Sequence, residues 1–273
     1  MSTNRKVISY WKRRKPSCEH DIAVLRPLSM LSGKRFETRK DALNEGIRSE
    51  TVLRDAGAPR HLWEYLAECR AGDYVCEQTF CPSCARQFRR WFIGEVLRIA
   101  EKNTKPAYFV TVLLAQATNI RELDPEPFRH SLRKQLDRAG LAEAVVIGGF
   151  EMVWRARQKA WVLHANLLVL GAEEDALVKF EDSFSSGVLA RPTQTAELRD
   201  LPEQISYLLK FTTYHRPHRQ TGSRRSPAKP LNPKEHVALV SWMSQYRFAD
   251  MLFLYHARRR GDRLTLTAPG APG

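Results

Sequence analysis

The chain has 273 residues, of which 43% are hydrophobic and 27% are charged, as in an ordinary soluble globular protein. No apolar run approaches the ~20 residues that a membrane helix needs, and the basic N-terminus lacks the apolar core and cleavage site of a secretory signal. We therefore expect a cytoplasmic protein with no membrane partner.

The 44 Lys and Arg exceed the 30 Asp and Glu, which gives a net charge of +14. This excess favours nucleic acid as the partner, because Lys and Arg release counterions from phosphates, although charge alone does not separate DNA from RNA or acidic lipid.

Residues 1–68 are predicted to form an N-terminal arm followed by a helical segment. Residues 1 to about 40 show little periodicity. Apolar residues then recur at helical spacing from Lys40 to Ala56 and again from Pro59 to Arg70. Gly57 separates the two predicted helices, and proline is well suited to begin the second.

Residues 69–102 are predicted to form a zinc knuckle and a basic helix. Four of the five cysteines fall within sixteen residues and end in a Cys-Pro-x-Cys motif: Cys69, Cys76, Cys81 and Cys84. In a reducing compartment this spacing favours a structural zinc ion with four thiolate ligands over disulfides, with buried or redox-active thiols as the alternative. Cys18 stands apart, and with His20 it could substitute as a ligand, although a plain thiol is favoured. The helix after Cys84 carries an apolar stripe flanked by arginines.

Residues 103–215 are predicted to form an α+β core with a central antiparallel sheet flanked by helices. Apolar runs rich in β-branched residues predict strands, and Asp-Pro and Gly signals mark the helix ends. The expected elements are a strand after Pro106, a helix from Asp124 to Gly140, a hairpin from Ala144 to Leu170, an acidic helix near Glu173–Phe184 and a strand near Thr193–Leu198.

The hairpin places polar side chains on one face of the sheet. If Arg157 and Gln158 form a two-residue loop, the residue numbers of each cross-strand pair add up to 315. Glu151 then lies opposite His164. Side chains alternate between faces along a strand, so Asn166 shares this face. A carboxylate, an imidazole and an amide oxygen together can hold a hard divalent cation, Mg²⁺ or Mn²⁺. A register slip of one residue would remove Glu151 from the site.

A helix predicted from Pro202 supplies a nucleophile. Tyr207 and Lys210 are three residues apart and would share a helical face. Placed against the metal face, Tyr207 could attack a phosphodiester while Lys210 stabilises the developing charge. Tyr214 would lie on much the same face, as a second hydroxyl or a stacking ring. The alternative for each residue alone is a structural role in the core.

Residues 216–273 are predicted to form a basic loop and a C-terminal helical segment. The stretch 216–231 is rich in Pro, Ser and positive charge and is typical of a loop. A helix then begins at Asn232-Pro233, and a last apolar segment, DMLFLYHARR, precedes a tail that we expect to be frayed.

Taken in order, these motifs resemble the HUH-type endonucleases, specifically the rolling-circle replication initiators and related transposases. The resemblance covers about residues 69 to 211. Its elements are the Cys-Pro-x-Cys segment, the strand Phe109–Val112 that contains Thr111, the strand carboxylate Glu151, the motif from His164 to Val169 and the motif Tyr207-Leu-Leu-Lys210. The family usually has a second histidine where this chain has Asn166.

The resemblance implies a cytoplasmic bacterial protein that nicks single-stranded or hairpin DNA at a plasmid origin or an element end and then religates it. It implies a 5′-phosphotyrosine at Tyr207, Mg²⁺ or Mn²⁺ at Glu151, His164 and Asn166, and a host helicase as partner because the chain has no helicase segment. Three alternatives remain at this point: a single-strand transposase of the same chemistry, a catalytically weak DNA-binding regulator of the same fold, and a zinc-knuckle nucleic-acid-binding protein whose Tyr207 and His164 belong to the core.

Overall fold

A computed structural model describes residues 37–72, 75–184, 192–198, 201–211, 213–215 and 228–267. Nearly all of the predicted N-terminal arm, with Cys18 and His20, lies outside these residues, as do most of the predicted basic loop and the end of the tail. Within the described ranges, no helix is both long enough and apolar enough to cross a membrane.

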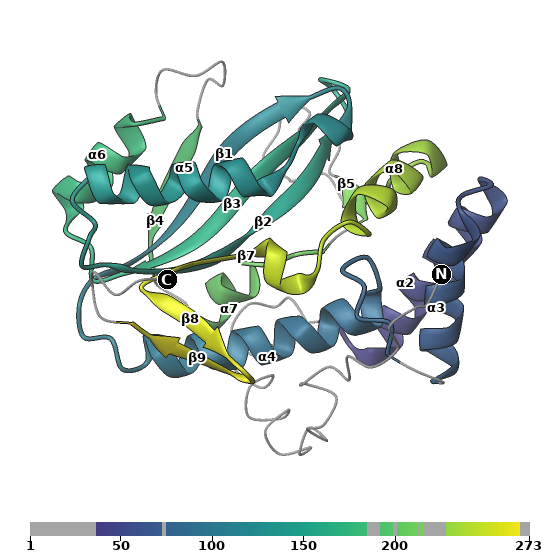
Figure 1. The fold of residues 1–273 in the computed structure, drawn as a ribbon, viewed down its shortest axis with the longest axis horizontal. Helices are drawn as coiled ribbons and strands as arrows, with labels where there is room; N and C mark the ends of the chain where they lie inside the picture. Colours follow the sequence, from purple (N-terminus) through teal and green to yellow (C-terminus); the bar gives the residue numbers. More distant parts are fainter. Residues whose placement is uncertain are drawn as a thin grey trace.

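The centre of the fold is a five-stranded antiparallel sheet, so the predicted α+β class with a central antiparallel sheet is confirmed (Figure 1). Its strand order is β4-β1-β3-β2-β7. The five strands are β1 (Ala107–Ala117), β2 (Val145–Arg155), β3 (Ala160–Leu170), β4 (Thr193–Glu197) and β7 (Leu252–Tyr255). β2 and β3 are the central strands and are buried along most of their length, which explains why both read as continuous apolar runs.

Helices flank this sheet, and several of their ends follow signals in the sequence. They are α2 (Arg39–Asp55), α3 (Arg60–Ala71), α4 (Pro82–Ala100), α5 (Pro125–Arg138), α6 (Glu174–Asp182), α7 (Leu201–Ser206) and α8 (Pro233–Met243), with short 3-10 turns η2 (Ile120–Glu122) and η3 (Phe248–Met251). The Asp124 carboxylate caps α5, and Gly140 follows the helix with a positive φ of 85°. The Asn232 side chain caps α8 in the same way.

The two faces of the sheet have different neighbours. α5 packs on the face that carries Phe150, where the Arg129 guanidinium lies 5.4 Å from the centre of the Phe150 ring. The opposite face carries Glu151, and residues 207–210 dock on it, with α4 beyond α7 (Figure 1). A single hydrophobic cluster runs from α2 to β9, so the helices and the sheet share one core.

The C-terminal segment, expected to be a loop and helices, also contains strands. After α8 and η3 the chain adds β7 to the edge of the sheet beside β2 and then forms a separate hairpin of β8 (Ala257–Arg260) and β9 (Arg263–Leu266). A second two-stranded sheet joins β5 (Tyr214–His215) to β6 (Lys229–Pro230). The run LFLY is too short for a helix that spans the core, and its Phe253 is fully buried on the sheet.

Candidate active site and zinc centre

The β2–β3 hairpin has the predicted register. Glu151 pairs with His164 and Trp154 pairs with Trp161, so paired positions sum to 315. The loop differs from the prediction, because it has four residues, Ala156 to Lys159, instead of two. A two-residue hairpin turn needs positive φ at one or both central residues, which Arg and Gln resist, whereas here only the last loop residue, Lys159, has a positive φ (47°). The predicted two-residue loop and the observed four-residue loop are both centred between Arg157 and Gln158. The register of the two strands is therefore the same with either loop.

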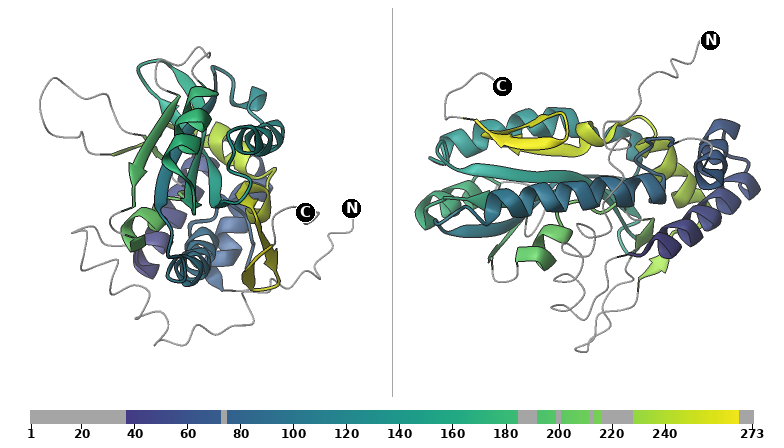
Figure 2. Two further views of the ribbon diagram at one scale, coloured as in Figure 1. Left: turned by 90° about the vertical axis from the view of Figure 1, so that its left-hand side faces the viewer. Right: turned by 90° about the horizontal axis from the view of Figure 1, so that it is seen from below.

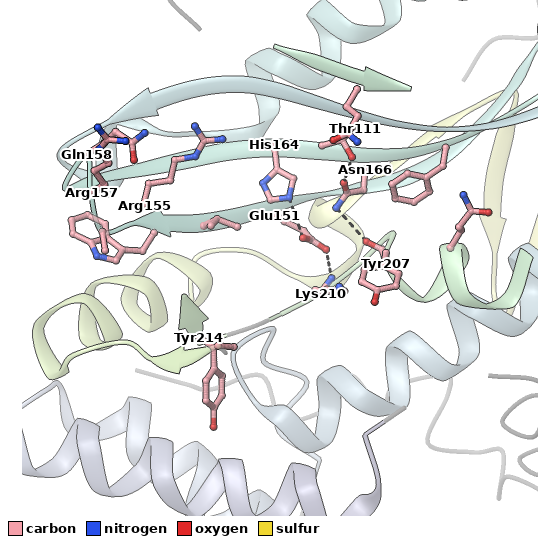
Figure 3. A pocket seen from close by; sticks show the side chains of 17 residues that line it. Thr111, Glu151, Arg155, Arg157, Gln158, His164, Asn166, Tyr207, Lys210 and Tyr214 are labelled. Atoms are coloured by element: carbon pink, nitrogen blue, oxygen red, sulfur yellow. Dashed lines mark hydrogen bonds and ion pairs between the residues drawn. The ribbon is translucent and has the colours of Figure 1, made fainter. Parts of the chain in front are cut away.

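Glu151 and His164 form a buried acid–imidazole pair. The His164 Nε2 atom lies 3.2 Å from the Glu151 Oε2 atom, and the two side chains are 11% and 5% exposed. The other Glu151 oxygen accepts a hydrogen bond from the backbone N–H of Lys210 (Figure 3). The carboxylate therefore joins the sheet to the segment that carries the predicted nucleophile.

Asn166 makes a second connection to that segment. Its Oδ1 atom accepts a hydrogen bond of 2.8 Å from the Thr111 hydroxyl, and its Nδ2 atom donates one of 3.2 Å to the backbone carbonyl of Tyr207 (Figure 3). Asn166 is 7% exposed. The role of Thr111 as a support for Asn166 was missed from the sequence, although the cross-strand pairing of β1 with β3 places the two residues opposite each other.

Tyr207 and Lys210 do not lie on a helix, which corrects the prediction that one helical face presents both. α7 ends at Ser206, and Tyr207 lies in the turn that follows. The Ser206 carbonyl accepts a hydrogen bond from Arg89, and the Tyr207 carbonyl accepts one from Asn166, while the Lys210 N–H bonds to Glu151. These long-range contacts use backbone groups that a continuing helix would need for its own hydrogen bonds.

The two side chains still meet after the helix ends. The Lys210 ammonium lies 3.2 Å from the centre of the Tyr207 ring, in a cation–π contact. In Figure 3 the Tyr207 ring extends away from the sheet, with its hydroxyl at the end remote from Glu151. The hydrogen bonds that join Tyr207 to Asn166 and Lys210 to Glu151 use backbone atoms of Tyr207 and Lys210.

A cleft of about 850 Å³ opens over this face of the sheet. The residues predicted for the metal, the nucleophile and the stabilising cation all line it: Glu151, His164, Asn166, Tyr207 and Lys210. The hairpin end contributes Arg155 and Arg157, and Tyr214 lies on the opposite side of the cleft (Figure 3). The mixture of cations, amides and aromatic rings suits a phosphate chain with bases.

The carboxylate and the imidazole are spaced as ligands of one ion would be. Two neighbouring ligands at about 2.1 Å from an octahedral ion lie about 3 Å apart, close to the observed 3.2 Å. An amide oxygen accepts through two lone pairs, and the Thr111 hydroxyl uses one of them at Asn166. Glu151, His164 and Asn166 therefore fit an Mg²⁺ or Mn²⁺ ion by donor chemistry.

The four predicted zinc ligands form a compact cluster. Their sulfur atoms all lie within 4.8 Å of one another, and the distances from Cys84 to Cys69 and to Cys76 are both 3.6 Å. Four ligands at about 2.3 Å in a tetrahedron lie about 3.8 Å apart, so the spacing fits zinc and is too long for a disulfide. Three of the cysteines are buried and Cys69 is half-buried. Cys69 comes from α3, whereas Cys81 and Cys84 begin α4, so a zinc ion here would fix the angle between these helices.

Tyr214 belongs to a polar network that ties α2 to the cleft. Its hydroxyl donates a hydrogen bond of 2.8 Å to Glu45, whose carboxylate also accepts hydrogen bonds from Thr213 and Arg48. Burial, together with the Glu45 carboxylate, raises the pKa of Tyr214 above its ordinary value. No signal in the sequence links Glu45 to a tyrosine that follows it by 169 residues.

Comparisons of the chain with protein-family models, with curated protein sequences and with solved structures found no match.

Proposed function

We propose that the protein is a metal-dependent DNA nickase and strand transferase of the HUH type, which acts through Tyr207 and initiates rolling-circle replication of a plasmid. The observation that carries the proposal is the cleft in which a buried Glu151–His164 pair lies on a sheet face together with Asn166, Tyr207 and Lys210. The fold class and the +14 charge are consistent with a nuclease that binds DNA.

In the proposed reaction the Tyr207 oxygen bonds to a phosphorus of single-stranded DNA. The bond from that phosphorus to the 3′ oxygen breaks, the Tyr207 hydroxyl gives up its proton, and the leaving oxygen takes up a proton to become a 3′-hydroxyl. Religation reverses these steps. When bound, Mg²⁺ or Mn²⁺ would polarise the phosphate and neutralise developing charge.

The residues of the chain divide the remaining tasks. Glu151, His164 and Asn166 would hold the ion, and Lys210 would place positive charge beside the phosphate. Attack on a phosphate at the Glu151–His164 pair requires the Tyr207 side chain to rotate towards the sheet, because its hydroxyl lies at the remote end of the ring (Figure 3).

The test incubates the protein and Mn²⁺ with a pool of single-stranded and hairpin oligonucleotides labelled at the 3′ end. Because the 5′ phosphate of the downstream fragment stays on the tyrosine, we expect a labelled protein band that survives SDS, whereas a 5′ label should give only a shortened oligonucleotide. Tyr207→Phe should abolish the band and the matched variant Tyr214→Phe should retain it. A band that persists in Tyr207→Phe would refute the assignment of the nucleophile.

A second candidate is a DNA-binding regulator of the same fold with little catalysis. The observation that favours it is the bonding of Asn166, whose amide already contacts both Thr111 and the Tyr207 carbonyl. This candidate predicts tight binding of single-stranded DNA with no SDS-stable band in wild type, at any Mg²⁺ or Mn²⁺ concentration.

A further inference from the structure

The β8–β9 hairpin has two chemically different faces. Arg258 pairs with Thr265 and Arg260 pairs with Arg263, so these four side chains share one face of a two-stranded ribbon. The other face carries Leu264, which is fully buried, and Arg259. We call the first of these the arginine face.

The ribbon is fastened to α4 through its backbone and through Arg259 of the other face. The Trp91 indole N–H donates a hydrogen bond of 2.6 Å to the Asp262 carbonyl, and the Leu264 N–H donates one of 3.0 Å to the Glu95 carboxylate. The Arg259 guanidinium lies 4.5 Å from the centre of the Trp91 ring. A lone two-stranded hairpin is marginally stable in water, so these contacts hold a ribbon that would not persist alone. The arginine face is consequently presented by a fixed backbone.

The arginine face carries three positive charges, of which one is paired with a carboxylate of the described residues. Arg258 and Arg260 are exposed, and neither forms an ion pair within the described residues. Arg263 contacts Glu95 at 3.2 Å, but its side chain is 48% exposed. Like charges directly opposite each other in a ladder are destabilising, and Arg260 lies directly opposite Arg263. An anionic partner would offset this repulsion.

The ribbon is separate from the cleft. Both views in Figure 2 place β8 and β9 on the side of α4 opposite to α7. No residue of the ribbon lines the cleft that contains Glu151 and Tyr207. A molecule that binds the arginine face therefore does not occupy the candidate active site.

We propose that the arginine face of the β8–β9 ribbon binds double-stranded DNA, with the ribbon in the major groove. A two-stranded ribbon fits the major groove of B-DNA, which is about 12 Å wide, and arginines suit both phosphates and guanine edges. The major groove of duplex RNA is too narrow for such a ribbon. The inference rests on the proposed function only in taking DNA as the polyanion. It assigns duplex DNA to the ribbon and the nicked single strand to the cleft.

The experiment measures binding to a fluorescent DNA duplex, to its single strand and to an RNA duplex of the same sequence, over a range of salt concentrations. We expect Arg258→Ala/Arg260→Ala to weaken binding of the DNA duplex about tenfold and to lower its salt slope by about 2, since each phosphate contact contributes about 0.9. Binding of the single strand should be unchanged. The matched control is Arg121→Ala/Arg138→Ala, which removes two exposed arginines from other elements and should leave the duplex affinity within about twofold of wild type.

Several outcomes would overturn the inference: an unchanged duplex affinity in the ribbon variant, an equal loss in the control, or an equal loss for single-stranded DNA or duplex RNA. Arg258→Lys/Arg260→Lys, which keeps the charge, should retain most of the binding. Glu151→Gln separates the two proposals, because it should abolish nicking and leave duplex binding intact. If Glu151→Gln loses nicking and the ribbon variant has no effect on duplex binding, the proposal for the ribbon is refuted and the proposed nicking function is not.

Discussion

Replacing Gly149 with alanine should disturb the contact between the sheet and the segment that carries Tyr207. A Cβ atom at Gly149 would lie 2.1 Å from the Leu209 Cδ2 atom and 2.6 Å from the Met251 carbonyl oxygen. The Leu209 side chain can move, but the Met251 carbonyl belongs to the backbone that leads into β7. Overpacking of this kind costs about 1–3 kcal/mol. We therefore expect Gly149→Ala to lower the free energy of unfolding by about 2 kcal/mol.

The matched control is Gly94→Ala in the middle of α4. A Cβ atom there would meet nothing within 4 Å, and alanine is favoured over glycine in a helix interior, so this variant should gain about 0.5–1 kcal/mol. Urea unfolding of both variants, with wild type alongside, measures the two changes in opposite directions. A Gly149→Ala variant within 0.5 kcal/mol of wild type, roughly the scatter expected for an unconstrained site, would show that residues 207–210 do not pack on Gly149 as described.

Two further predictions concern the zinc centre and a buried histidine. Cys84→Ser should lose bound zinc, measured by metal analysis of the purified protein, and should unfold at a lower urea concentration. The control variant Cys18→Ser should keep one zinc ion per chain. Equal zinc content in both variants would contradict the assigned ligands. His236 is fully buried beside Ser49. Burial, with a smaller contribution from Arg48, lowers the pKa of His236 to about 4. The unfolded state therefore binds more protons than the folded state below about pH 6.5, and stability should fall as the pH drops from 6.5 towards 4. Between pH 7 and pH 5 the protonation of this group should lower the free energy of unfolding by about 2 kcal/mol, and His236→Gln should lose that part of the pH dependence. Urea unfolding at several pH values measures this, and the same change of unfolding free energy with pH in wild type and variant would refute the prediction.

The sequence predicted the sheet well because local patterns determine it. The polar turn between two apolar runs fixes the pairing of Glu151 with His164, because a two-residue loop and the observed four-residue loop share the same centre. The cysteine spacing was equally informative, because two of the four clustered cysteines are three residues apart at the start of a helix. In both cases the residues that determine the contact lie within about twenty positions of each other.

The end of α7 could not be predicted in this way. Leu208 and Leu209 favour a helix, and nothing nearby in the sequence stops it at Ser206. The helix ends because Arg89, Asn166 and Glu151, which are distant in the sequence, bond to the backbone from Ser206 to Lys210. Tertiary contacts here override propensity, and they change which parts of Tyr207 and Lys210 face the sheet.

These same contacts connect the polar residues of the sheet to the segment that carries Tyr207. The Glu151 carboxylate bonds to the Lys210 N–H, and the Asn166 amide bonds to the Tyr207 carbonyl, so two of the three proposed metal ligands also hold the segment that carries the proposed nucleophile. A cation held by Glu151 would draw electron density from its carboxylate and would weaken that carboxylate as an acceptor for the Lys210 N–H. In the proposed reaction, a looser bond here would free the backbone that carries Tyr207, whose side chain has to rotate towards the sheet. In the proposed mechanism, metal binding and the rotation of Tyr207 would therefore be linked through hydrogen bonds that exist before either occurs. Asn166 would contribute to that link through its amide nitrogen, a donor that an ionised carboxylate at this position would lack.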